Sequence, residues 1–392
     1  MIGIRYRFLL AAATLMATAA GCTLEPRFMQ PPPPIADAYP AATGSGTVTA
    51  DEIGWRDFFT DPRLQRLIGL ALQNNRDLRV AILNVEQARA EYRIARAALF
   101  PTLNGNASLT RSRTPADLSP FGTSVISNDD TITADAAWEI DLFGKNRSLS
   151  RAAIDKYLAT REARRAAQMS LVAQVADQYL TILAYEKELA VTANILTTAQ
   201  ANLALAKAEF GAGNQTALDF AEAETVVDQA QANLAEQQRL RDQANNALEL
   251  LVGEPIPTDL PPPLPLDSQN LLADIPAGLP SDLLTRRPDI LEAEDSLRAA
   301  NADIGAARAA FFPSLSLTGE YGTASSALTG LFGSNRAIWS FGPSLNIPVF
   351  EGGTNFANLE SAKAQQGIAV AEYEKAIQAG FQIGRASCRE RV

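Results

Sequence analysis

The most closely grouped carboxylates in the sequence are Asp135, Glu139 and Asp141, which fall at alternate positions of one stretch. On a strand such residues share one face, where paired carboxylates can act as general acid and general base. The chain has no histidine, so histidine-dependent triads and the usual zinc sites have no support. We therefore interpret these carboxylates as a pore-lining or solvated face. No catalytic residue, metal or cofactor is predicted, and the protein is not expected to be an enzyme.

A second residue with chemistry of its own is Cys22, which follows two arginines and an apolar run over residues 8–20. This order is typical of a secretory signal, here residues 1–21. Because residues 19–22 read Ala-Ala-Gly-Cys, similar to a lipoprotein cleavage box, we predict lipidation of Cys22 and a lipidated N-terminal segment over 22–60. The alternative is an ordinary signal-peptidase site beside an incidental cysteine.

The charge balance argues against a nucleic-acid partner. The 392 residues include 34 Lys and Arg against 44 Asp and Glu, a formal net charge of −10. A nucleic-acid footprint needs a basic surface. Two cysteines are too few for a disulfide framework.

One passage occurs twice, and it indicates an internal duplication. The stretch ARAALFPTL at residues 95–103 returns 212 positions later around a second Phe-Pro pair. Each copy joins an Ala-rich helical pattern to a strictly alternating one. We therefore predict helix-to-strand junctions at Phe100, Pro101, Phe312 and Pro313.

Two strand hairpins, at residues 102–142 and 314–350, are predicted from alternation of apolar and polar residues. Each run lasts roughly 10 residues, enough for a tilted strand to cross a bilayer, and Trp138, Trp339 and Tyr321 suit the interface. The alternative is a half-buried soluble sheet, which has the same period. Four strands cannot close a barrel, so the chain must assemble with copies of itself. Two copies would give a filled interior and three a water-filled pore, which the polar inward face favours.

Long helices are predicted on either side of these strands. Residues 148–210 contain neither Pro nor Gly, and apolar residues recur every seventh position from Val175 to Phe210, as in a coiled-coil seam. A return helix is predicted over 216–251, beginning at a box of Thr216 and Asp219. A further helix is expected from about Asn74 to Leu99.

These elements divide the chain into a first repeat over 61–250, a Pro-rich linker over 251–280 and a second repeat over 281–383. The second copy's long helix is expected to start near Thr354 and to stop around Ile383, much sooner than the first, so we interpret this repeat as incomplete. The final residues, 384–392, break the apolar pattern and are interpreted as a non-native tail.

Several passages together resemble the outer membrane factor lipoproteins of resistance-nodulation-division efflux systems, relatives of TolC. They are the Ala97 to Pro101 junction, Trp138 to Gly144, the tip at Gly211 to Asp219, Arg286 to Ile290, and the matching residues Trp55, Phe58, Asp61, Pro62, Leu64, Asn74, Asn75 and Leu78. The resemblance implies an α+β membrane protein, with four transmembrane strands per chain in a trimeric 12-stranded barrel and long coiled helices in a periplasmic α-barrel.

The resemblance also implies a homotrimer in the outer membrane, lipid-anchored and extending into the periplasm, with a periplasmic adaptor and a proton-driven inner-membrane transporter as partners. The adaptor would meet the helical tip, whose matching residues here are Gly211, Gly213, Asn214, Gln215, Thr216, Leu218 and Asp219. Measured against this family, the chain is expected to be truncated at its C-terminal end.

The expected function is a passive conduit that exports drugs or other small molecules. One alternative is the outer channel of a protein-secretion or heavy-metal efflux system. Another is a periplasmic coiled-coil lipoprotein that does not span the membrane.

Overall fold

The computed structural model describes residues 23–35, 53–120, 122–269 and 284–389, with side chains described as far as residue 382. The predicted signal segment and Cys22 lie outside the described residues. The chain divides into two compact units. The first comprises residues 1–34, 86–160 and 291–378, and the second comprises residues 35–85, 161–290 and 379–392.

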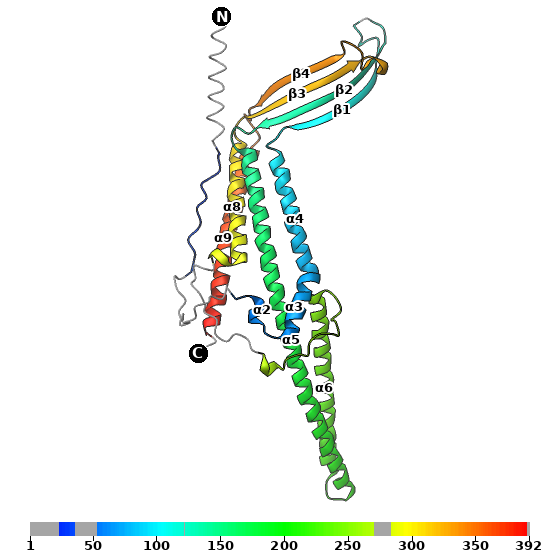
Figure 1. Cartoon of the computed structure of the whole chain (residues 1–392), viewed down its shortest axis with the longest axis vertical. Coiled ribbons are helices and arrows are strands. Elements are labelled where there is room, and N and C mark those ends of the chain that lie inside the picture. The colour runs from blue at the N-terminus through cyan, green and yellow to red at the C-terminus, as the bar shows by residue number, and fades with distance from the viewer. Residues whose placement is uncertain (1–22, 36–52, 121, 270–283, 390–392) are drawn as a thin grey trace. The chain divides into compact units, whose positions relative to one another are not determined.

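The first unit contains one antiparallel sheet of four strands in the order β1-β2-β3-β4 (Figure 1). The strands are β1 (Thr102–Thr114), β2 (Val125–Ile140), β3 (Ser314–Ser325) and β4 (Ala337–Asn346). The two hairpins are joined by pairing of β2 with β3, so β1 and β4 are the two edges. β4 tolerates Pro343 because proline is compatible with an edge strand.

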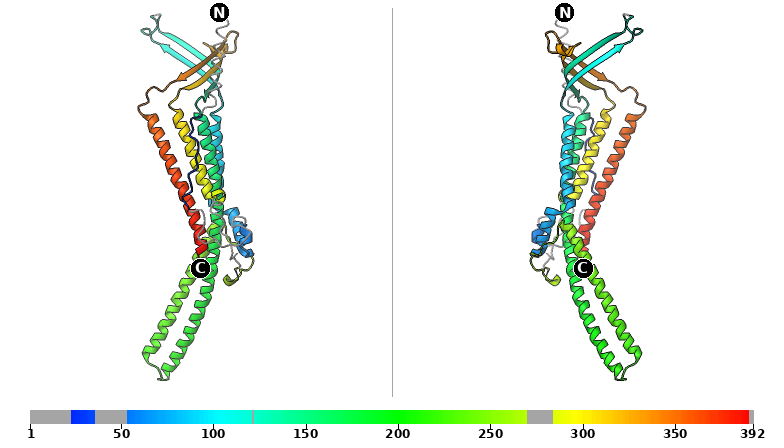
Figure 2. Two further views of the ribbon diagram at one scale, coloured as in Figure 1. Left: turned by 90° about the vertical axis from the view of Figure 1, so that its left-hand side faces the viewer. Right: turned by 90° about the vertical axis from the view of Figure 1, so that its right-hand side faces the viewer.

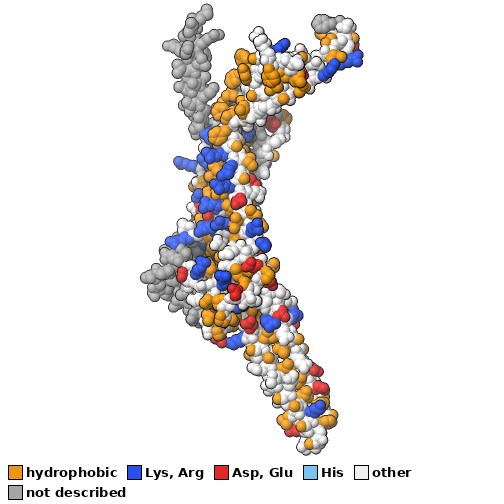
Figure 3. Space-filling view, turned by 45° about the vertical axis from the view of Figure 1, so that its right-hand side comes forward, with side chains coloured by type: hydrophobic (Ala, Val, Ile, Leu, Met, Phe, Trp, Pro, Cys, Tyr) orange, Lys and Arg blue, Asp and Glu red, His pale blue; other side chains and the backbone are white. Residues whose placement is uncertain are grey.

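The strand register separates one polar face from one apolar face. Along one row Asn104 lies opposite Asp135, which lies opposite Glu320. In the neighbouring row Ala134 lies opposite Tyr321, which lies opposite Trp339. No other described part of the chain covers the apolar face: Trp339 is 77% exposed and Tyr321 66%. Hydrophobic side chains are visible on the sheet in Figure 3. The predicted alternation is thus present across all four strands.

The second predicted strand was extended too far. β2 ends at Ile140. The carboxylate of Asp141 accepts hydrogen bonds from the backbone N–H and the Nε of Arg147, at 2.9 and 3.2 Å. Asp141 therefore caps the start of the following helix and does not belong to the polar face of the sheet, because local backbone donors outcompete continuation of the strand.

Each strand of the first unit connects to a long helix. These are α4 (Arg76–Ala97), α5 (Lys145–Gly211), α8 (Pro288–Ala309) and α9 (Thr354–Arg389), and a short η3 (Leu328–Gly330) lies between β3 and β4. Within this unit the helical segments lie side by side in the order of their strands (Figure 2). α9 begins at Thr354 as expected, but it continues to Arg389 where the sequence pattern indicated an end near Ile383.

The second unit is helical. It contains α2 (Trp55–Phe58), α3 (Pro62–Asn74), the lower part of α5, α6 (Ala217–Val252) and η2 (Leu266–Ser268). Its core joins α3, α5 and α6, with Val175, Ile182 and Leu248 at most 5% exposed. Farther along, Leu196 and Leu203 of α5 pack against Val227 and its neighbours in α6. The seven-residue spacing therefore faces the α5–α6 interface.

The helix expected from about Asn74 to Leu99 is α4, Arg76–Ala97, and it follows α3, a helix that the sequence pattern had not indicated, after the single residue Asn75. The Asn75 side chain accepts from the Leu78 N–H at 2.9 Å and caps α4, and it donates to the Leu251 carbonyl at 2.9 Å. Asn75 has extended backbone angles, φ −60° and ψ 131°. The buried Asn75 thus caps the start of α4, bonds to the last turn of α6 and separates α3 from α4.

Candidate functional site: sheet face, junctions and helical tip

The carboxylates on the polar face of the sheet have hydrogen-bonding and ionic partners. Asp135 accepts a hydrogen bond from the Thr133 hydroxyl at 3.3 Å and another from the Asn106 amide. Glu139 lies 3.6 Å from the Lys145 ammonium. Within the described ranges no three His, Cys, Asp or Glu side chains are placed to hold a metal ion. These side chains form a hydrophilic wall, which is what a water-filled passage requires.

The two predicted junctions have the same local geometry. At the end of α4 the Phe100 N–H bonds to the Ala97 carbonyl at 3.0 Å, and at the end of α8 the Phe312 N–H bonds to the Ala309 carbonyl at 3.0 Å. Both bonds span three residues and tighten the last turn before a proline. The equal geometry 212 positions apart supports the internal duplication.

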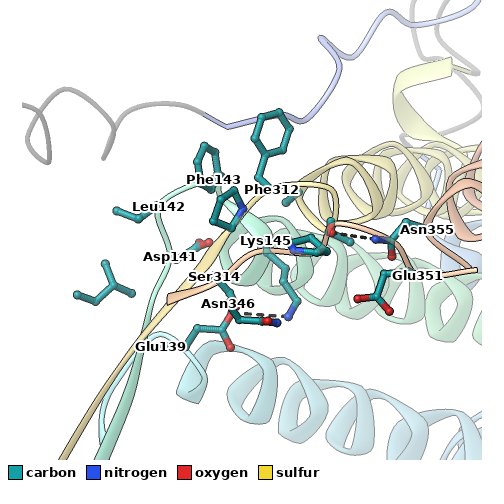
Figure 4. Close-up of a pocket in the computed structure, with 15 residues that line it drawn as sticks. Glu139, Asp141, Leu142, Phe143, Lys145, Phe312, Ser314, Asn346, Glu351 and Asn355 are labelled. Carbon is teal, nitrogen blue, oxygen red and sulfur yellow. Dashed lines mark hydrogen bonds and ion pairs between the residues drawn. The ribbon is translucent and has the colours of Figure 1, made fainter. Parts of the chain in front are cut away.

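A cavity of about 190 Å³, lined by both polar and apolar side chains, lies at the second junction. Figure 4 shows its lining, in which Phe312 stacks on Phe143 with ring centroids 4.7 Å apart. The Asn355 amide donates to the Ala310 carbonyl at 3.2 Å and ties the start of α9 to the end of α8. Residues of both repeats therefore meet where helix changes to strand.

The helical tip is a tight turn between α5 and α6. Gly213 has φ +80°, and the Asn214 N–H reaches back to the Glu209 carbonyl at 2.9 Å. Thr216 and Asp219 form a reciprocal capping box, with the Asp219 N–H donating to the Thr216 hydroxyl at 3.3 Å. The Asp219 carboxylate in turn accepts hydrogen bonds from the Thr216 hydroxyl at 2.7 Å and the Thr216 N–H at 3.0 Å, and these two bonds lower the pKa of Asp219. Gly211, Gly213, Asn214, Thr216, Leu218 and Asp219 are exposed and Gln215 is half-buried, so the turn presents a preformed surface.

The residues after Cys22 form a feature that pattern reading did not identify. Glu25 pairs with Arg151 at 2.7 Å, and Arg308 donates to the Leu24 carbonyl at 3.3 Å. Farther along, Asn301 donates to the Pro26 carbonyl at 2.9 Å and Gln30 donates to the Tyr373 hydroxyl at 2.7 Å. This segment follows α8 away from the junction, so its first residues lie at the strand end of α8. No local spacing signals an extended segment that is held by distant side chains.

These features define a class of protein: a membrane channel subunit with an amphipathic four-stranded sheet and long helices that end in an exposed turn. By length and composition alone, one helix among the described residues, α5, could also cross a membrane. One such helix is weak evidence for a membrane span, whereas the sheet, with one polar and one apolar face, has the pattern of a transmembrane barrel.

Comparison with known proteins gives the family. The profile of the outer membrane efflux protein family matches residues 67–254 and 279–383. The chain is 47% identical over 367 residues to the solvent efflux pump outer membrane protein SrpC of Pseudomonas putida, covering 92% of this chain and 78% of SrpC. It is 44% identical over 376 residues to the outer membrane protein OprJ of Pseudomonas aeruginosa, covering 95% and 78%.

Solved structures agree. The open state of the Neisseria gonorrhoeae MtrE outer membrane channel matches with a TM-score of 0.83 and 41% identity, over 93% of this chain and 81% of MtrE. CusC matches with a TM-score of 0.79 and 38% identity, over 92% and 81%. The chain belongs to the outer membrane efflux protein family. It is an efflux channel component of the outer membrane, and the predictions of family, fold class, function and localisation are confirmed at this level.

Proposed function

We propose that three copies of the chain form a closed 12-stranded barrel that serves as a passive exit duct. The observation that carries this proposal is the sheet, which is mainly polar on one face and mainly apolar on the other and whose two edges, β1 and β4, are unpaired among the described residues. Open edges are not tolerated in lipid, so pairing of β1 with β4 of another copy removes both. Three copies leave room for water.

Disulfide trapping tests this assembly. Cysteines at Asn106 in β1 and Ser344 in β4, in a Cys388→Ser background, should form a ladder that ends at a covalent trimer. Cysteines at Thr133 and Thr318, both on central strands of one chain, are the matched control and should not link chains. A ladder that ends at a dimer, or links through the central strands, would contradict the trimer.

We propose that the turn from Gly211 to Asp219 contacts a periplasmic adaptor, which connects the duct to a proton-driven inner-membrane transporter. Support comes from the exposure of this turn and its rigid capping. A photo-cross-linker at Asn214 should capture the adaptor in an assembled pump. The same probe at Gln229, exposed in mid-α6, should not. Equal capture at both positions would argue against tip docking.

We propose that Cys22 is lipidated and anchors the chain at the periplasmic surface of the outer membrane. The next residues are held at the strand end of α8, four residues before the Phe312 junction, where an acyl chain reaches the bilayer. Metabolic labelling with a palmitate analogue should be lost in Cys22→Ser and retained in Cys388→Ser. Label that persists in Cys22→Ser would contradict this anchor.

We propose that the cargo consists of small amphipathic or apolar molecules. Relatives are described as parts of solvent, toluene and antibiotic efflux pumps. In a strain lacking its outer channel, expression with a matching adaptor and transporter should restore tolerance to toluene and antibiotics. Restoration of copper tolerance or protein secretion alone would favour the alternative channel classes, and absence of single-channel conductance would favour a scaffold.

A further inference from the structure

Three arginines form a basic face on the part of α4 that leads into the membrane strand. Arg89, Arg93 and Arg96 are all exposed and lie four and seven residues apart, so they share one side of the helix. Arg89, the farthest, is eight residues from the end of α4 at Ala97, about 12 Å of helix rise. Lys and Arg side chains gather over the helices of this unit in Figure 3.

The nearest carboxylate on this side of α4 is Glu86, three residues before Arg89, and it forms no ion pair with the three arginines in the described part of the chain. No ion pair is formed by any of the three guanidinium groups there, whereas neighbouring cations of the same unit are paired, such as Lys156 with Asp303 at 3.0 Å. The one carboxylate among residues 87–97 is Glu91, which accepts from Gln87 at 2.9 Å. Glu91 lies on a different side of the helix from the arginines.

The two flanks of α4 on either side of the arginines differ in exposure. Ala88, Tyr92 and Ala95 are half-buried and form the flank that packs within the chain. The opposite flank consists of Ala90, Ile94 and Ala97, which are exposed and apolar or small. That flank suits close approach of a helix from a second copy. The arginines lie between these two flanks, so they remain exposed when both are covered.

We infer that Arg89, Arg93 and Arg96 bind the phosphate groups of anionic phospholipids in the periplasmic leaflet of the outer membrane. α4 leads through Pro101 directly into β1, whose apolar side chains, such as Leu103, are exposed on the membrane-facing side of the sheet. The headgroup layer extends about 5–8 Å beyond the hydrocarbon core, and arginine side chains extend toward it. The charge is complementary to phosphate, and α4 continues along the chain into a membrane-spanning strand after four intervening residues.

The test measures binding of phosphatidylglycerol to the full-length assembly in neutral detergent by native mass spectrometry, with phosphatidylcholine for comparison. The double variant Arg93→Gln, Arg96→Gln should lose about 30-fold in affinity for phosphatidylglycerol, given the usual contribution of two basic residues at an anionic surface. The control is Arg76→Gln, Arg79→Gln, which removes the same charge from the far end of the same helix and should change binding less than about threefold. Circular dichroism and heat-modifiable migration establish that both variants fold.

Several outcomes would overturn the inference. These are equal affinity of the unmodified protein for both lipids, equal losses in both variants, or an unchanged affinity in Arg93→Gln, Arg96→Gln. If Arg93→Gln, Arg96→Gln disrupts the assembly but does not weaken lipid binding, the arginines contact a neighbouring copy of the chain instead of lipid. If that variant alters ion selectivity in single-channel recordings but does not weaken lipid binding, the arginines line the lumen of the channel. Failure of the duct function itself appears separately, as absent conductance in the unmodified protein.

Discussion

The Tyr179 hydroxyl donates a 2.7 Å hydrogen bond to the carboxylate of Asp61, and both residues are almost fully buried, at 2% and 1% exposed. Asp61 also accepts from the Arg63 N–H at 2.8 Å, where it caps α3, and from the Gln269 amide at 3.0 Å. One carboxylate therefore fastens α3, α5 and the Pro-rich linker together within the second unit.

Removal of the Tyr179 hydroxyl should loosen this unit locally. Tyr179→Phe should reduce the local free energy of opening of α3 by about 1–2 kcal/mol, because a buried acceptor loses one of several donors. Amide hydrogen exchange of residues 62–74 measures this loss. Tyr157→Phe is the control, because the half-buried Tyr157 of α5 forms no side-chain hydrogen bond among the described residues, and it should change the free energy of opening by less than about 0.5 kcal/mol. Equal effects would contradict the role of Asp61.

Stability should fall in acid because of Asp61. Burial by itself raises its pKa, but hydrogen bonds from Gln269, Tyr179 and the backbone outweigh burial and hold the pKa below the ordinary 3.8. Because the folded-state pKa is depressed, this stabilisation is fully present above pH 3.8 and is lost as pH falls through the folded-state value. Guanidinium midpoints between pH 6 and about pH 3 should fall more steeply for the unmodified protein than for Asp61→Asn. If the midpoints of the unmodified protein and of Asp61→Asn fall equally with pH, Asp61 is not the source of the acid sensitivity.

Two glycines with left-handed backbones should respond differently to alanine. Gly253 has φ +83°, and a Cβ there would lie 2.5 Å from the Asn74 carbonyl oxygen, whereas Gly213 has φ +80° and no neighbour within 4 Å. Gly213→Ala should cost about 1 kcal/mol in backbone strain alone. Gly253→Ala should cost about 3 kcal/mol or more, because α3 and α6 must separate. Denaturant unfolding of both variants measures the difference, and similar midpoints would refute the close approach.

The sheet offers a second matched pair, both members on β3. A Cβ at Gly322 would lie 2.1 Å from the Ile132 carbonyl oxygen, and one at Gly319 would have no neighbour closer than a ring carbon of Phe341 at 3.9 Å. Gly322→Ala should therefore disrupt pairing of β2 with β3 and reduce assembled channel in the outer membrane. Gly319→Ala should assemble normally. Heat-modifiable migration on gels gives the readout, and normal assembly of Gly322→Ala would count against the observed register.

The tip should fray when its capping box is removed. Thr216→Val deletes the hydroxyl that accepts the Asp219 N–H, so amides of residues 217–220 should exchange faster. Thr225→Val is the control, because the Thr225 hydroxyl donates to the Ala221 carbonyl of its own helix at 2.9 Å and its loss leaves no helix end uncapped. If amide exchange at residues 217–220 is unchanged in Thr216→Val, the glycine turn alone keeps the start of α6 ordered and the capping box is not needed.

Much of the candidate site could be predicted because its signals are local. The period of two in the strands, the repeated Phe-Pro junction and the Thr216 box each occupy a few consecutive residues. The extended backbone at Asn75 could not be predicted in this way, since the Leu251 carbonyl that its side chain contacts lies 176 residues away. The end of β2 before Asp141 was missed although its cause is local, because the period of two continues to Leu142 while the Asp141 carboxylate bonds to Arg147, six residues on.

By itself, the sequence determined the class of the protein, because alternation, duplication and the seven-residue seam are fixed by spacing along the chain. Only the tertiary structure showed that Tyr179 and Gln269 meet at Asp61, 118 and 208 residues away along the chain. It also showed that Gly322 must be glycine, because the Ile132 carbonyl approaches it too closely for a side chain. Contacts over such separations depend on how the elements pack, and no local pattern encodes them.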